Sequence, residues 1–195
     1  MSQSKRLLNF SAGPCQLPVE VMEDVQRELV DFRGWGISVM EMSHRGPHFK
    51  KVLQEAKEAA TRFLEIPQTH NLLFMSGGAT AQFAAEALNL LTPEFPRADY
   101  AITGYWSKYA MKEASMYGET KAVTDAAAKD YLEIDPVETW EMSEKVAYLH
   151  YCENETIHGL EFPAAPPVKK LLPDLLLPGG PPGGPRGPPN EPFLQ

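Results

Sequence analysis

The glycine turn Gly77-Gly78-Ala79-Thr80 has the residue types and the setting of a phosphate-binding site. It follows a short apolar run and precedes a helical pattern, a layout that aims backbone N–H groups at an anion. A structural turn, in which glycine is needed only for backbone shape, explains the same residues. The turn lacks the Gly-Lys-Ser/Thr ending of a Walker A loop and the spacing of the dinucleotide fingerprint. Phosphate binding and a purely structural turn therefore both stay open on this segment alone.

A second polar cluster, Ser43-His44-Arg45-Gly46, follows an apolar-leaning segment. Arg45 beside His44 suits the recognition of a carboxylate or a phosphate, because a guanidinium group forms bidentate contacts with either. A solvated loop ahead of a helix accounts for the same four residues equally well. The cluster is therefore a candidate anion site with a plain structural alternative.

Trp106 and Thr156 are candidates for holding a flat ring. Trp106 stands in a turn that begins at Gly104, where its indole could serve as a stacking platform or as an ordinary core or rim side chain. Thr156 follows the strand pattern that ends at Tyr151. Ligands of open α/β sheets bind at the carboxyl ends of the strands. Because the glycine turn, Trp106 and Thr156 all follow predicted strands, we expect them at one edge of a sheet.

Helical and strand patterns alternate along the elements that must position these residues. Periodic apolar residues predict four helices, and short apolar runs predict three strands between them. The helices are expected from Pro18 to Phe32 with Gly34 ending the first, from Pro47 to Leu64, over 81–91, and from Ser107 as a possible cap to Tyr117; the strands are 72–75, 100–103 and 146–151. This alternation predicts an α/β domain with a largely parallel sheet.

Composition limits the classes of function. The chain has 195 residues and a net charge of -8, which argues against a general binder of nucleic acid or of anionic membranes. No secretory signal or apolar run of about 20 residues is present, so we expect a cytoplasmic protein. Cys15 and Cys152 are expected to be free thiols. No histidine pair has metal-ligand spacing, and no Cys/His or serine arrangement for nucleophilic catalysis is evident.

The composition changes after Phe162. Residues 163–195 contain 11 Pro and 5 Gly, which break helices and strands. Such a segment cannot bury enough apolar surface to offset the conformational entropy lost on ordering. We therefore predict one α/β unit over 1–162 and a disordered tail over 163–195.

Five motifs, in order, resemble phosphoserine aminotransferase across residues 9–162. They are Asn9-Phe10-Ser11-Ala12-Gly13-Pro14, Ser38-Val39-Met40-Glu41-Met42-Ser43-His44-Arg45, Gly77-Gly78-Ala79-Thr80-Ala81-Gln82-Phe83, Thr103-Gly104-Tyr105-Trp106 and Asn154-Glu155-Thr156-Ile157-His158-Gly159. The resemblance implies the large domain of a fold-type I enzyme that depends on pyridoxal 5′-phosphate, normally a homodimer. It also implies amino transfer between O-phospho-L-serine and 2-oxoglutarate, as part of L-serine biosynthesis.

The resemblance also assigns roles to the candidate residues. Ala79 and Thr80 would hold the cofactor phosphate, Trp106 would stack on the pyridine ring, and Thr156 would contact the cofactor near its ring oxygen. Arg45, with His44 beside it, would meet an acidic group of the substrate. Family members carry Ser or Ala where this chain has Ala12, so no hydroxyl contact is expected there.

The departure from the family follows Thr156. The resemblance implies a Schiff-base lysine and an aspartate that pairs with the pyridinium nitrogen, and neither has a counterpart here. Lys169 and Lys170 lie in the Pro-rich segment, and so does Asp174. We therefore expect this chain to be inactive alone. The alternatives are a truncated non-catalytic chain that pairs with a full-length subunit, and another fold-type I enzyme, against which His44, Arg45 and Trp106 argue.

Overall fold

The computed structural model describes residues 6–167. The chain divides into two compact units, Met1–Leu73 and Phe74–Gln195. Most of the predicted tail, including Lys169 and Lys170, lies outside the described residues. Among the described residues, no helix is both long enough and apolar enough to cross a membrane.

The first unit is helical. It contains α1 (Val19–Glu28), the short 3-10 helices η1 (Phe32–Gly34) and η2 (Val39–Glu41), and α2 (Pro47–Phe63). Helix α2 begins at Pro47 as predicted, because proline at the first helical position gives up an N–H that has no intrahelical partner. Helix α1 stops at Glu28, so the expected extension to Phe32 is wrong. The backbone leaves the helical path there and reaches a left-handed φ of 56° at Arg33.

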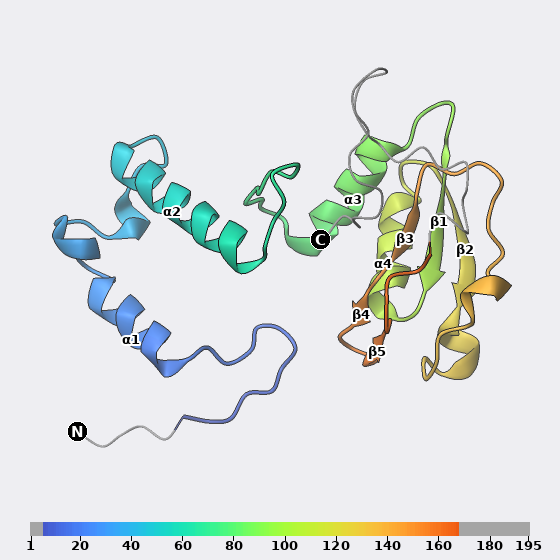
Figure 1. Ribbon diagram of the computed structural model, residues 1–195, viewed down its shortest axis with the longest axis horizontal. Helices are drawn as coiled ribbons and strands as arrows, with labels where there is room; N and C mark the ends of the chain where they lie inside the picture. The colour runs from blue at the N-terminus through green and yellow to red at the C-terminus, as the bar shows by residue number, and fades with distance from the viewer. Residues whose placement is uncertain (1–5, 168–195) are drawn as a thin grey trace. The chain divides into compact units, whose positions relative to one another are not determined.

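The second unit is an α/β layer (Figure 1). Its elements are α3 (Gly78–Leu90), β1 (Arg97–Ile102), α4 (Tyr105–Ala114), β2 (Glu119–Asp125), η3 (Ala126–Lys129), η4 (Val137–Thr139), β3 (Leu149–Tyr151), β4 (Asn154–Glu155) and β5 (Leu160–Glu161). The main sheet has the order β2-β1-β3, and both pairings are parallel. This confirms the predicted parallel sheet. The segments β4 and β5 form a separate antiparallel pair.

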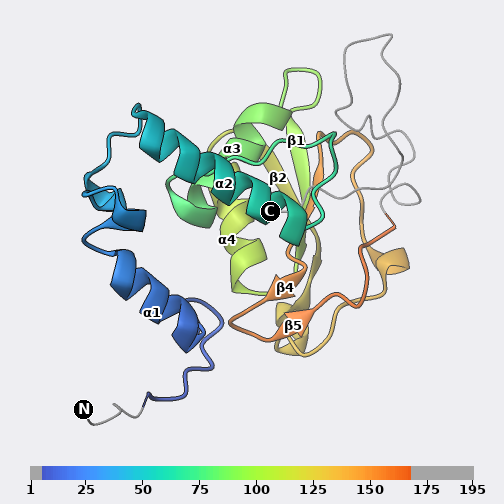
Figure 2. The ribbon, with the colours of Figure 1, turned by 60° about the vertical axis from the view of Figure 1, so that its left-hand side comes forward.

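Both faces of strand β1 are buried. Tyr100 and Ile102 pack with α3 and α4, which lie against one face in both ribbon views (Figures 1 and 2). Ala101 faces the other side and packs with Trp140 and Phe162. Alternation along the strand thus supplies two small cores, and it fixes α4 against the sheet directly after β1.

Several predicted boundaries differ from the structure. The apolar run at 72–75 forms no strand; Leu73, Phe74 and Met75 are 66%, 60% and 65% exposed. A fully apolar run pairs only where a neighbouring strand and a covering helix exist, and the described residues supply neither for this run. Strand β3 is shorter than predicted. Strand β2 was missed, because its sequence carries five polar residues among seven.

Candidate functional site

Trp106 and Thr156 come together at the carboxyl end of the sheet. Trp106 lies in the first turn of α4, and Thr156 directly follows β4. The indole Nε1–H of Trp106 donates a hydrogen bond of 2.9 Å to Oγ1 of Thr156. The indole is half-buried, and Thr156 is exposed. The hydrogen bond leaves the hydroxyl proton of Thr156 free to donate to another group.

The amino end of α4 is closed by side chains from the segment that follows β4. A helix leaves its first N–H groups without intrahelical partners. Trp106 N and Ser107 N each donate a 2.8 Å hydrogen bond to the carboxylate of Glu155, one to Oε2 and one to Oε1. Tyr105 N donates to Nδ1 of His158 at 3.2 Å. These three bonds satisfy the amides of the first turn, so α4 offers no open amides to an anion.

Gly104 makes room for the Glu155 carboxylate at this helix end. A Cβ atom on Gly104 would lie 2.6 Å from Cδ of Glu155, well inside contact distance. The φ of Gly104 is 175°, an extended conformation that any residue adopts. The glycine is therefore required for space rather than for backbone shape. Ser107 completes the cap, because its Oγ accepts from the backbone N–H groups of Thr103 and Gly104 at 2.9 and 3.1 Å. Helix α4 thus begins at Tyr105, and Ser107 caps from inside the first turn rather than from ahead of it; the helix ends at Ala114 rather than Tyr117.

The amino end of α3 is open. Its capping residue, Gly77, has a left-handed φ of 95° and no side chain to cap the helix. The first intrahelical bond runs from Ala81 N to Gly77 O. Within the described part of the chain, the N–H groups of Gly78, Ala79 and Thr80 have no acceptor, and all three residues are exposed. Unpaired amides and the helix dipole together favour an anion such as a phosphate group at this end.

Helices α3 and α4 bring these two ends close together. Phe83, in the second turn of α3, packs edge-to-face on Tyr109, in the second turn of α4, with ring centroids 6.3 Å apart. The open anion-binding turn and the fixed indole therefore belong to neighbouring first turns in the same layer. This arrangement fits a ligand with one phosphate group and one flat ring.

The two remaining candidates belong to the other unit. His44 and Arg45 are exposed and lie immediately before α2. The backbone N–H of Arg45 donates to Oγ of Ser43 at 3.3 Å. The segment is a polar loop that leads into a helix. Both side chains are exposed and could meet an acidic ligand.

Comparison with known proteins places the chain in a family. The family model described as aminotransferase class-V matches residues 7–172, which is most of the chain. The chain belongs to the class-V aminotransferases.

The relatives of this class-V aminotransferase chain share one name. The phosphoserine aminotransferase of Pseudomonas entomophila is 46% identical over 163 residues, covering 84% of this chain and 45% of that protein. The phosphoserine aminotransferase of Drosophila melanogaster is 44% identical over 167 residues, with 86% and 45% covered. The chain thus spans less than half the length of the relatives it matches.

Solved structures agree with these relatives. The phosphoserine aminotransferase of Bacillus circulans subsp. alkalophilus superposes with a TM-score of 0.77 at 40% identity, over 84% of this chain and 45% of that one. The PLP-bound phosphoserine aminotransferase of Trichomonas vaginalis gives 0.76 at 39% identity, over 83% and 45%. The predicted fold class, part of a PLP-dependent transferase of this type, is confirmed.

Sequence reasoning missed two residues at the amino end of α4. Glu155 and His158 close the end of α4, yet the sequence analysis assigned neither residue a role. The available signal was Gly104, which stands at a capping position where a Ser, Thr, Asp or Asn side chain is usual. A helix that starts after such a glycine needs an acceptor from elsewhere in the chain.

A Cys/His/Glu row that sequence analysis did not find lies between α3 and β3. Nδ1 of His150 is 2.8 Å from Oε2 of Glu86, and Sγ of Cys152 is 3.8 Å from Nε2 of His150. Burial raises the pKa of the Cys152 thiol to about 12, and the charge of Glu155 adds to the shift. A nucleophilic cysteine needs a lowered pKa, and the pKa of this thiol is raised instead. The hydrogen bond between His150 and Glu86 joins α3 to β3. The described residues contain no group of three side chains that could hold a metal ion.

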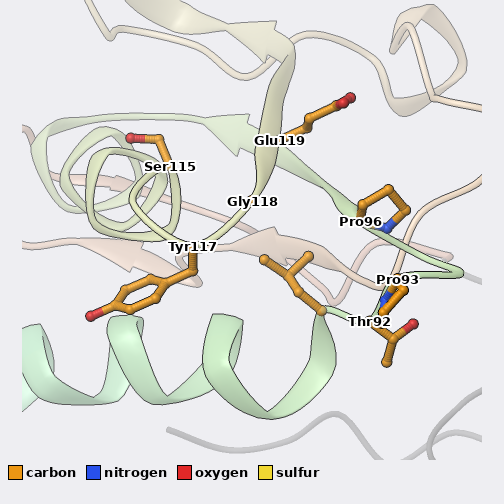
Figure 3. Close-up of a pocket in the computed structure, with 8 residues that line it drawn as sticks. Thr92, Pro93, Pro96, Ser115, Tyr117, Gly118 and Glu119 are labelled. Carbon is orange, nitrogen blue, oxygen red and sulfur yellow. The ribbon is translucent and has the colours of Figure 1, made fainter.

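An open hollow of about 600 Å³ lies at the opposite ends of the strands (Figure 3). Its lining residues come from the ends of α3 and α4 and the starts of β1 and β2: Leu91, Thr92, Pro93, Pro96, Ser115, Tyr117, Gly118 and Glu119. Glu119 is engaged by Arg97, whose Nε donates to its carboxylate at 3.0 Å. The charged residue of the hollow, Glu119, is therefore already paired. Ligands of open α/β sheets bind at the carboxyl ends of the strands, whereas this hollow lies at the amino ends, so it is not the candidate site.

Proposed function

We propose that this chain carries the pyridoxal-phosphate-binding part of a phosphoserine aminotransferase, which acts in L-serine biosynthesis. The observation that carries the proposal is the contrast between two neighbouring helix ends. Among residues 6–167, the first amides of α3 have no acceptor, while the end of α4 is closed and its indole is hydrogen-bonded to Thr156. The name shared by the relatives supports the same cofactor and substrates.

Different residues bind different parts of the cofactor. The amides of Ala79 and Thr80 and the Thr80 hydroxyl bind the phosphate group, and the indole of Trp106 stacks on the ring. Thr156 accepts the indole N–H, and its own hydroxyl proton would be available to the cofactor near the ring oxygen. When bound, pyridoxal phosphate supplies an electron sink for amino transfer between O-phospho-L-serine and 2-oxoglutarate.

Arg45 and His44 bind the acidic groups of the substrate. The chain has a net charge of -8, so binding of a doubly anionic substrate needs a local cation. Arg45 supplies one with a geometry that matches a carboxylate or a phosphate group. The enzyme as a whole is proposed to be a cytoplasmic homodimer.

Pyridoxine 5′-phosphate tests the cofactor site without interference from surface lysines. It keeps the ring and the phosphate group but has an alcohol in place of the aldehyde, so it forms no covalent link with an amine. Binding to residues 1–195 is followed by calorimetry, with pyridoxine as the ligand that lacks phosphate. We expect binding of the phosphorylated ligand, weakened by Thr80→Ala and by Trp106→Ala, and little binding of pyridoxine. Thr69→Ala and Trp35→Phe, both in the first unit, are the matched controls. Equal binding of both ligands, or equal loss in site and control variants, would refute the proposed site.

Amino transfer by these 195 residues is measured separately. We expect no glutamate from O-phospho-L-serine and 2-oxoglutarate with this chain alone, because the resemblance assigns covalent attachment to a lysine without a counterpart here. Turnover that disappears in a single lysine variant would overturn that expectation. Turnover that appears only with a full-length relative would favour the paired, non-catalytic alternative.

A further inference from the structure

Two consecutive residues hold Trp106 at two places. Thr156 accepts the indole N–H, and Glu155 accepts the backbone N–H of the same tryptophan. The position of the indole relative to Thr156 therefore depends on how firmly the segment that carries both residues is fixed to α4.

Glu155 provides that fixation. Its side chain is fully buried, and both carboxylate oxygens accept amide protons from the first turn of α4. The carboxylate faces the N–H groups of Trp106 and Ser107, and the positive end of the helix dipole favours an acidic group there. The thiol of Cys152 is a further neighbour of this carboxylate.

The geometry is that of a helix cap divided between distant parts of the chain. In a capping box, the side chain of the capping residue accepts the N–H of the third helical residue, and the side chain of that third residue returns to the capping residue. Here the Ser107 hydroxyl accepts the backbone N–H of Gly104, as the third helical residue does in a capping box. Glu155 accepts the N–H groups of Trp106 and Ser107, which Gly104 cannot do because it has no side chain. The space left by the absent Gly104 side chain is the space that Glu155 fills.

We propose that Glu155 is a positioning residue for the ring-stacking tryptophan, a role that rests on the proposed cofactor site. By capping α4 from the β4 segment, it fixes the backbone of Trp106 and at the same time places the next residue, Thr156, against the indole. Cofactor affinity depends on Glu155 although its carboxylate does not touch the cofactor.

The test replaces one carboxylate oxygen by a donor. In Glu155→Gln the amide NH₂ faces an N–H group, so at least one buried amide loses its acceptor. In the ligand-free chain we expect the Trp106 indole resonance, assigned through Trp106→Phe, to shift or broaden. We expect hydrogen exchange at Trp106 and Ser107 amides to accelerate roughly tenfold or more, and the affinity for pyridoxine 5′-phosphate to fall about tenfold, the equivalent of one lost charge-assisted hydrogen bond. Glu153→Gln, exposed and two residues earlier, is the matched control and should change neither.

A rescue variant separates positioning from general stability. Gly104→Asp combined with Glu155→Ala returns the capping carboxylate to the capping residue, where aspartate is favoured. The double variant should restore slow amide exchange, a sharp indole resonance and most of the affinity. It keeps the proposal testable even if Glu155→Gln does not fold. A wild-type indole resonance and wild-type exchange in Glu155→Gln, or a folded rescue variant without recovery of any readout, would refute the role of Glu155. If the wild-type chain does not bind pyridoxine 5′-phosphate, the proposed function fails, while the ligand-free resonance and exchange still decide the role of Glu155.

Discussion

The indole N–H of Trp106 donates to Oγ1 of Thr156 although the two residues are 50 positions apart. One lies in the first turn of α4 and the other follows β4. The bond restricts rotation of a half-buried ring that would otherwise have several orientations. It therefore converts an ordinary rim tryptophan into a platform of defined orientation.

Thr156→Val should free the indole with little loss of stability. The hydrogen bond is exposed, so its removal costs about 1 kcal/mol or less in the free energy of unfolding. Pyridoxine 5′-phosphate should bind several-fold more weakly, because the ring partner must be ordered on binding. Thr156→Ser keeps the hydroxyl and should bind as the wild type does. Calorimetry and urea unfolding measure the two effects; a serine variant as weak as the valine variant would count against the hydrogen bond.

Gly77→Ala should be more destabilising than Gly78→Ala. Both residues have left-handed φ, 95° and 59°, so alanine is strained at either position. Only at position 77 would the new Cβ also collide, lying 2.5 Å from Cβ of Ala81. We expect a loss of about 1 kcal/mol for Gly78→Ala and a larger loss for Gly77→Ala, with weaker phosphate binding in the latter. Urea unfolding decides the order, and equal losses would contradict it.

Cys152 should resist alkylation. A pKa of about 12, against an ordinary 9.0, lowers its thiolate fraction at pH 8 by roughly a thousandfold. Cys15 is exposed and should react first with iodoacetamide, as read by peptide mass spectrometry. Because the charge of Glu155 contributes to the shift, Glu155→Gln should lower the pH at which Cys152 becomes reactive, while Glu153→Gln should not. Rapid modification of Cys152 in the wild type at pH 8 would contradict a raised pKa for this thiol.

The second unit should lose stability in alkali. Burial raises the pKa of Tyr148 to about 12. Burial and the hydrogen bond with Tyr148 raise the pKa of Tyr100, and burial raises that of Cys152. These groups stay protonated in the folded state, whereas the unfolded chain releases their protons from about pH 9 upward. The free energy of unfolding is therefore undiminished below about pH 9 and falls as pH rises toward 12, by at most about 1.4 kcal/mol per pH unit for each group.

Tyr148→Phe isolates one of these groups. It also removes the 2.7 Å hydrogen bond with Tyr100, so stability at pH 7 should fall by about 1 kcal/mol. The decline between pH 9 and 11 should nevertheless be shallower than in the wild type. Urea unfolding at four pH values measures the slope, and an unchanged slope would remove Tyr148 from the explanation.

Arg45→Ala should weaken substrate binding without affecting the cofactor. A guanidinium group pairs with the carboxylate or phosphate group of O-phospho-L-serine, so the affinity for this substrate should fall tenfold or more, whereas pyridoxine 5′-phosphate should bind unchanged. Arg62→Ala, at the exposed end of α2, is the charge-matched control. An equal loss for both ligands would assign Arg45 a structural role.

The sequence by itself determined the local elements with strong signals and the family. Pro47 and the apolar stripe after it fixed the start of α2, and alternating strands and helices predicted a parallel sheet. Glycine at 77 and 78 marked the turn before α3, because few other residues adopt a left-handed φ. These features depend on neighbours in the chain, which a sequence displays directly.

Tertiary structure alone decided how α4 is capped and which apolar run pairs. The Gly104 turn shows that a side-chain acceptor is missing, but Glu155 supplies it from about 50 residues away, and only the packing of β4 on α4 brings the two together. The run at 72–75 has the apolar character of a buried strand, yet a strand exists only through hydrogen bonds to a neighbour. Helix capping by a distant residue and strand pairing are both contacts between segments far apart in the chain. A local residue pattern can indicate that a partner is needed, but it does not identify the partner.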